Sequence, residues 1–133
     1  MPGPRKVWGY EIRDQLYPGE ENYFRQNRNV TGMAAEDGRI TLNPYSMLSP
    51  QQFDSVAKNE AARLYMKEMG YKFDFDPTPE QVQSFRGSPY ANDPHNMSAT
   101  ILARALSGDP SAGTLSQRQQ QWVDWLADQL NKR

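Results

Sequence analysis

The 133-residue chain contains no cysteine and a single histidine, His95. Without cysteine it cannot form a disulfide, a thiolate nucleophile or a cysteine-ligated metal site. One histidine cannot complete a zinc site or suggest a Ser-His-acid set, and His95 follows Pro94 in a polar, turn-rich stretch that we expect to be a solvent-facing loop. We therefore expect no metal and no other cofactor.

Long hydrophobic runs are also missing. Hydrophobic residues make up 37% of the chain, and no window approaches the roughly 20 apolar residues of a membrane span. The residues after Met1 lack the apolar run of a signal peptide. We expect a soluble protein made in the cytosol, without a membrane partner.

No charge of one sign dominates, since 15 basic and 16 acidic residues give a net charge of -1. An overall basic surface, which is typical of nucleic-acid-binding proteins, is therefore excluded, although a local basic patch is not. The length fits one domain, residues 1–133. Residues 1–6 hold two prolines and few apolar side chains, so we predict an extended N-terminal arm there.

A strand followed by a long helix forms the centre of the predicted fold. Apolar and polar residues alternate over residues 39–43, which indicates a strand. Ser49, Pro50 and Gln52 then form a capping box with proline at the first helical position, and Gly70 can end the helix in a left-handed conformation. An apolar stripe predicts the buried face of this helix: Phe53, Val56, Ala57, Ala61 and Leu64.

Shorter patterns predict the other elements. Residues 7–12 read as a strand, residues 30–35 and 39–43 as a hairpin, and residues 20–28 as a loop or short helical turn. Residues 71–75 alternate aromatic and polar side chains, as an extended segment on the core would. Short helices near Val82 and over residues 98–106, and a last helix that has its capped start at residues 114–117 and runs to about Leu130, complete the chain. The predicted fold is α+β and mostly helical: a β-hairpin or small sheet on a long central helix, two short helices and a C-terminal helix.

Glu60 is the unusual residue of the apolar stripe, because a buried carboxylate is costly unless a cation pairs with it. We predict a structural ion pair with Arg63, three residues on, or with Arg104 from another helix. Asn59, Glu60 and Arg63 also occupy the positions of the HExxH motif, so this helix resembles that of zinc-dependent peptidases. Asn59 and Arg63 replace both zinc-binding histidines, which argues against metal-dependent catalysis.

Two groups of aromatic and basic residues are candidate partner-binding sites. Tyr23 and Phe24, beside Arg25 and Arg28, could stack on bases and hold phosphates, or simply fix a loop to the core. Three tryptophans could finish the core or dock on a protein partner: Trp8, Trp122 and Trp125.

The run LNPYSMLSPQQFDSVAKNEAARLYM, the later segment ILARALSGDPSA and the tryptophan-bearing last helix together resemble small uncharacterised proteins of short-tailed bacteriophages that infect marine bacteria. The resemblance carries no functional motif, but it implies a viral context, in the host cytoplasm or the virion. We therefore expect a non-catalytic structural or interaction protein, with a virion or host protein as partner. A small nucleic-acid-binding regulator and a degenerate zinc-peptidase-like or other hydrolase are the alternatives.

Overall fold

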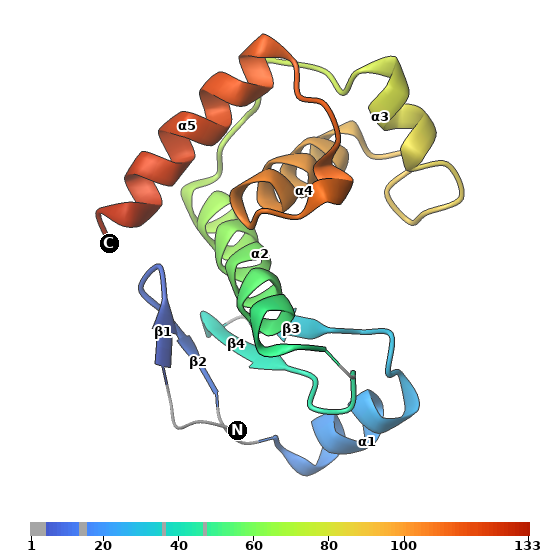
Figure 1. Cartoon of the computed structure of the whole chain (residues 1–133), viewed down its shortest axis with the longest axis vertical. Helices are drawn as coiled ribbons and strands as arrows, with labels where there is room; N and C mark the ends of the chain where they lie inside the picture. The colour runs from blue at the N-terminus through green and yellow to red at the C-terminus, as the bar shows by residue number, and fades with distance from the viewer. Residues whose placement is uncertain (1–4, 14–15, 36, 47) are drawn as a thin grey trace.

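The computed structural model describes residues 5–13, 16–35, 37–46 and 48–133. The long helix α2 (Pro50–Met69) runs through the middle, with a four-stranded sheet and α1 at its N-terminal end and three further helices around its C-terminal half (Figure 1). The fold is α+β and mostly helical, as the sequence predicted. The first four residues of the predicted N-terminal arm lie outside the described residues.

The sheet has the strand order β1-β2-β4-β3. Strands β1 (Arg5–Val7) and β2 (Tyr10–Ile12) form an antiparallel hairpin, and so do β3 (Gly32–Ala34) and β4 (Arg39–Leu42). The two hairpins join through parallel pairing of β2 with β4. At Gly32 an added Cβ would lie 3.0 Å from a Val56 methyl group, so glycine allows β3 to lie directly against α2.

The predicted single strand over residues 7–12 is wrong, because the chain reverses in its middle. Trp8 and Gly9 have φ angles of 50° and 84°, and positive φ at both central positions is what a tight type I′ hairpin turn requires. Residues 5 and 6 belong to β1 rather than to a free arm. The hairpin predicted over residues 30–43 is confirmed.

Helix α1 (Pro18–Gln26) occupies the stretch that we predicted as a loop or short helical turn. Proline at the first position, two glutamates in the first turn and Arg25 in the last turn suit a helix and its dipole. The Arg13 guanidinium pairs with Glu20 and also contacts Thr41, which ties α1 to the sheet. A single buried side chain, Phe24, anchors α1, and one anchor is too few to give a visible period in the sequence.

The limits of α2 agree with the prediction from its caps. Ser49 Oγ accepts a hydrogen bond from the Gln52 backbone N–H, and the Gln52 side chain accepts one from the Ser49 N–H at 2.7 Å. Gly70 leaves the helix with φ of 62° in the left-handed region. The chain then continues as an extended segment without strand pairing, and Tyr71, Phe73 and Phe75 pack on the core.

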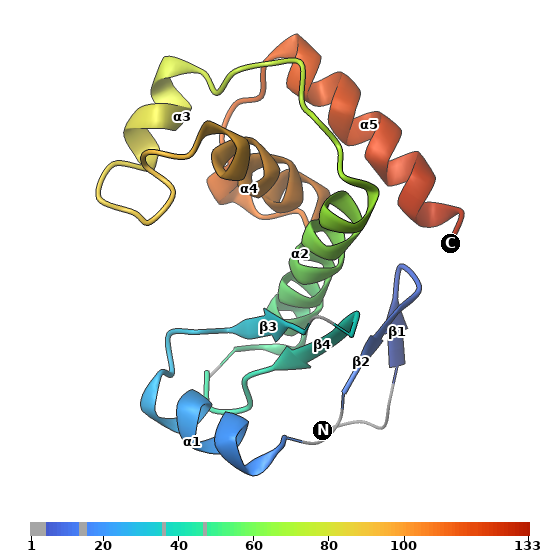
Figure 2. The ribbon, with the colours of Figure 1, turned by 180° about the vertical axis from the view of Figure 1, so that it is seen from behind.

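Three more helices and a 3₁₀ turn close the structure: α3 (Pro79–Ser84), α4 (Pro94–Leu106), η1 (Pro110–Ala112) and α5 (Gln117–Asn131). Helix α4 packs on α2, and α5 runs back so that its C-terminal end approaches the β1–β2 hairpin, as both views show (Figures 1 and 2). Helix α4 begins four residues before the predicted residue 98, because Asp93 caps it. His95 therefore lies in a helix and stacks on Phe73, with ring centroids 5.1 Å apart, rather than in a loop.

Candidate functional site

A polar cleft of about 370 Å³ opens between α2 and α4, and Glu60 is one of its lining residues. Arg63 of α2, Arg104 of α4 and Asp109 contribute the other charged side chains, and Tyr90 comes from the loop before α4. Two cations and two carboxylates thus face the same small volume. We call this site the polar cleft.

Glu60 is half-buried, and burial raises the pKa of its carboxyl group; the charge of Arg63 opposes this shift only in part. Arg63 directs its guanidinium elsewhere: Nε donates to Asn59 Oδ1 at 3.1 Å and Nη2 donates to Thr100 Oγ1 at 2.8 Å. Among the described residues Glu60 forms no ion pair within 4.0 Å, so neither predicted pair, with Arg63 or with Arg104, is present.

The side chains at the positions of the HExxH histidines bind each other. Asn59 accepts the hydrogen bond from Arg63, so the amide oxygen already has a donor. Within the described part of the chain, no three His, Cys, Asp or Glu residues lie close enough to hold a metal ion. The likeness to zinc peptidases is therefore limited to a capped helix with a glutamate at one position.

Glu60→Gln is expected to leave the free energy of unfolding at pH 7 unchanged or to raise it. The reason is that a raised pKa in the folded state means that ionised Glu60 opposes folding. Protonated Glu60 favours the folded state fully below the unfolded-state pKa, and this contribution is lost as the pH rises through the folded-state pKa. Urea unfolding from about pH 4 to about pH 8 measures this contribution of Glu60, because the wild-type protein should lose stability relative to the variant as the pH rises over that range.

A clear loss of stability in Glu60→Gln at pH 7, of about 1 kcal/mol or more, would mean that the carboxylate makes a charge-assisted hydrogen bond after all. Asn59→Ala is the companion variant, since it removes the acceptor of Arg63 and leaves Glu60 in place.

The two arginines of the polar cleft rest on aromatic rings. The Arg63 guanidinium carbon lies 5.6 Å from the Tyr90 ring centroid, and that of Arg104 lies 5.1 Å from the Phe85 centroid. The two rings also meet edge to face, 6.1 Å apart. A cation–π contact does not use the N–H groups of a guanidinium, so these groups can donate to a ligand, apart from Arg63 Nε and Nη2, which already donate within the protein.

A second hollow, of about 640 Å³, lies between the C-terminal end of α2, the extended segment after it and the start of α4. Its apolar wall consists of Met66, Tyr71, Phe73 and Ala99, and its basic and imidazole groups come from four residues: Arg63, Lys67, Lys72 and His95. Among the described residues that line it there is no carboxylate. We call this site the basic hollow.

Aromatic side chains next to the basic hollow fix the extended segment to α5. The ring centroid of Trp122 lies 5.3 Å from that of Phe73 and 5.9 Å from that of Trp125. The Tyr71 and Trp125 centroids are 5.3 Å apart, and all three pairs meet edge to face. Trp122 is half-buried, whereas Trp125 keeps 45% of its surface exposed. Trp122 is thus mainly a core residue, and Trp125 remains accessible.

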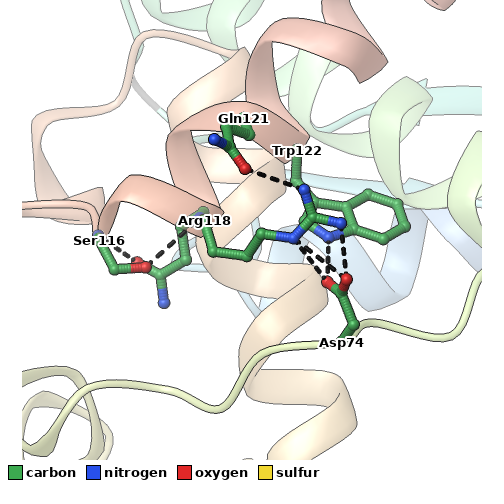
Figure 3. Close-up of polar contacts among 6 residues, drawn as sticks. Asp74, Ser116, Arg118, Gln121 and Trp122 are labelled. Carbon is green, nitrogen blue, oxygen red and sulfur yellow. Dashed lines mark hydrogen bonds and ion pairs between the residues drawn. The ribbon is translucent and has the colours of Figure 1, made fainter.

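Figure 3 shows the polar contacts that Trp122 and Arg118 make with Asp74. Trp122 Nε1 donates to Asp74 Oδ1 at 2.7 Å, and the Arg118 guanidinium donates to both Asp74 oxygens, through Nε at 3.0 Å and through Nη2 at 2.6 Å. These hydrogen bonds from Arg118, and next that from Trp122, lower the pKa of Asp74 to about 2.

Asp74 should therefore stay ionised in acid, and Arg118→Gln should raise its pKa towards the ordinary value. The folded state gains from the ionised group above the unfolded-state pKa, and this gain is lost as the pH falls from that value towards about 2. NMR titration of the Asp74 carboxyl carbon and of the Trp122 indole N–H measures the change. Lys132→Gln, which breaks the Lys132–Asp128 pair elsewhere on α5, should leave Asp74 unaffected.

The candidate residues near the N-terminus do not form one site. Trp8 donates from its indole N–H to Asn131 Oδ1 at 3.1 Å, so it joins the β1–β2 hairpin to the end of α5. Phe24 is completely buried and cannot stack on a base, which corrects that prediction. Tyr23 and Arg28 are exposed, and Arg25 pairs with Glu21 and bonds to Tyr45.

Sequence reasoning missed the basic hollow. Lys67 and Lys72 lie on either side of Gly70, the residue at which the chain leaves α2. This pair of lysines around the helix end was the sequence feature that could have indicated a basic site. The contribution of His95 could not be read in this way, because it depends on how α4 packs across α2.

None of the described helices is long and apolar enough to cross a membrane. Comparison of this chain with family models, curated proteins and solved structures found no match.

Proposed function

We propose that this protein is a non-catalytic interaction protein that binds an acidic segment of a protein partner in the basic hollow. The observation that supports this is the composition of the hollow, in which an apolar wall is surrounded by Arg63, Lys67, Lys72 and His95. Protein interfaces commonly combine one buried apolar anchor with charge complementarity around it. A partner segment with one apolar side chain between carboxylates fits such a surface.

The surroundings of the hollow favour a peptide over a nucleic acid. Glu68 and Asp74 are exposed carboxylates next to lining residues in the chain, and Asp74 is already paired with Arg118. A nucleic-acid strand carries a charge at every phosphate, so a strand that ran along α2 past Lys67 would be repelled by the carboxylate of Glu68. A short acidic segment does not need to extend that far. The resemblance to phage proteins makes a virion or host protein the first class of partner to test.

The test uses a synthetic peptide in which one phenylalanine lies between runs of glutamate, with tryptophan fluorescence as the readout because Trp122 contacts Phe73. We expect binding that weakens about tenfold or more in the double variant Lys67→Gln/Lys72→Gln. The double variant Lys6→Gln/Arg28→Gln is the matched control: it removes the same charge from exposed positions on the sheet and after α1, and should bind as the wild type does.

Three comparison ligands decide the outcome. A peptide with alanine in place of phenylalanine should bind more weakly, and one with lysine in place of glutamate should not bind. A single-stranded oligothymidine that binds more tightly than the acidic peptide, with a steep dependence on salt, would replace this proposal by the nucleic-acid alternative. Equal binding of the peptide to the wild type and to Lys67→Gln/Lys72→Gln would exclude the basic hollow as its site.

A further inference from the structure

The polar cleft shares Arg63 with the basic hollow but differs from it in charge, because it also holds two carboxylates. Its volume of about 370 Å³ lies at the small end of the range for small-molecule sites. An acidic protein segment does not suit this cleft, since Glu60 and Asp109 would repel it. The cleft therefore has its own ligand chemistry.

The arginines of the cleft have donors to offer. Among the described residues, Arg104 makes no ion pair and its guanidinium donates no hydrogen bond, and Arg63 uses Nε and Nη2 but not Nη1. Cation–π contacts of Arg104 with Phe85 and of Arg63 with Tyr90 restrain both side chains before a ligand arrives. Restrained guanidinium groups lose little entropy on binding and suit the two oxygens of a carboxylate.

The carboxylate of Glu60 supplies the opposite charge in the same cleft. We infer that the polar cleft binds a small zwitterion of the amino-acid type, with the ligand carboxylate between Arg63 and Arg104 and the ligand ammonium against Glu60. The balance of two cations and two carboxylates in the lining matches a ligand that carries one charge of each sign. A simple anion would satisfy the arginines but would leave the half-buried Glu60 without a cation.

Binding of such a ligand is coupled to the ionisation of Glu60. Burial raises the pKa of this carboxyl group in the free protein, and an ammonium placed beside it would lower that pKa again. The titratable or charged side chains facing it across the cleft are Arg63 on α2, Tyr90 in the loop before α4, Arg104 on α4 and Asp109 after α4. Affinity is thus expected to increase as the pH rises through the pKa of Glu60 in the free protein.

The experiment screens the free amino acids as probes by thermal unfolding and measures any that stabilise the protein by calorimetric titration. At least one should bind, and its analogue without the amino group and its methyl ester should each bind at least about tenfold more weakly. Arg104→Gln should lose about tenfold or more in affinity, whereas Arg86→Gln, at an exposed arginine outside the cleft, should not change it.

Glu60→Gln keeps the shape of the side chain and should both weaken binding and remove its pH dependence. If Arg104→Gln fails to fold, Glu60→Gln by itself tests whether the cleft binds the zwitterion. The inference is overturned if no amino acid binds, or if inorganic phosphate or the analogue without the amino group binds as tightly as the amino acid, because the cleft would then be a plain anion site. None of these results depends on Lys67 or Lys72, so the inference and the proposed function can fail separately.

Discussion

Phe24→Ala is expected to lower the free energy of unfolding by about 3 to 5 kcal/mol, the usual cost of removing a large aromatic side chain from a core. Phe24 has no exposed surface and is the only buried residue of α1. Without it the helix keeps the Arg13–Glu20 pair but loses its apolar anchor, and nine residues of helix are too few to be stable alone. Urea unfolding followed by circular dichroism measures the loss.

Tyr23→Ala is the matched control, since the neighbouring ring is 45% exposed and its removal should cost less than about 1 kcal/mol. This pair of variants also separates core packing from nucleic-acid binding. If Phe24→Ala were as stable as the wild type, Phe24 would have to lie at the surface, and the stacking role predicted for residues 23–28 would become possible again.

Asn43→Ala is expected to cost about 3 to 4 kcal/mol, because the fully buried Asn43 side chain satisfies backbone groups of two loops. Its Nδ2 donates to the Val30 carbonyl at 2.7 Å and, at 3.3 Å, to the carbonyls of Phe24 and Asn27. Its Oδ1 accepts a hydrogen bond from the Tyr45 N–H at 2.8 Å. The Phe24 and Asn27 carbonyls would keep their backbone donors, but alanine would remove the partner of the Val30 carbonyl and of the Tyr45 N–H and would also leave a small cavity.

The effect of Asn43→Ala should be seen in denaturant unfolding and in faster hydrogen exchange of the Tyr45 amide. Asn29→Ala is the control, because Asn29 is an exposed asparagine in the loop that contains Val30 and should change stability by no more than about 0.5 kcal/mol. A cost for Asn43→Ala as small as that for Asn29→Ala would show that water can replace the buried amide.

The limits of the central helix could be predicted from the sequence because they depend on residues only three or four positions apart. Ser49 and Gln52 bond to each other's backbone, and Gly70 adopts the left-handed conformation with little steric cost. The turn that joins β3 and β4 is local in the same sense. These features need no information about the rest of the chain.

Burial of polar side chains could not be predicted, because it depends on elements that meet only in the folded protein. Gln119 lies in a run of glutamines in α5, yet it is fully buried and exchanges two side-chain hydrogen bonds with Gln81, at 2.8 and 2.7 Å, which join α3 to α5. Both are the third helical residue of their capping boxes. The local role was readable, but the contact across 38 residues was not.

The candidate sites show the same division between features set by neighbouring residues and features set by tertiary contacts. The sequence by itself identified Glu60 as a carboxylate on a packed helix, because helical spacing places residues on one face. Only the tertiary structure decided that Arg63 also binds Thr100, that the Arg104 guanidinium lies over the Phe85 ring, and that Glu60 faces a polar cleft. A charged side chain has several partners within reach, and the packing of α4 against α2 selects among them.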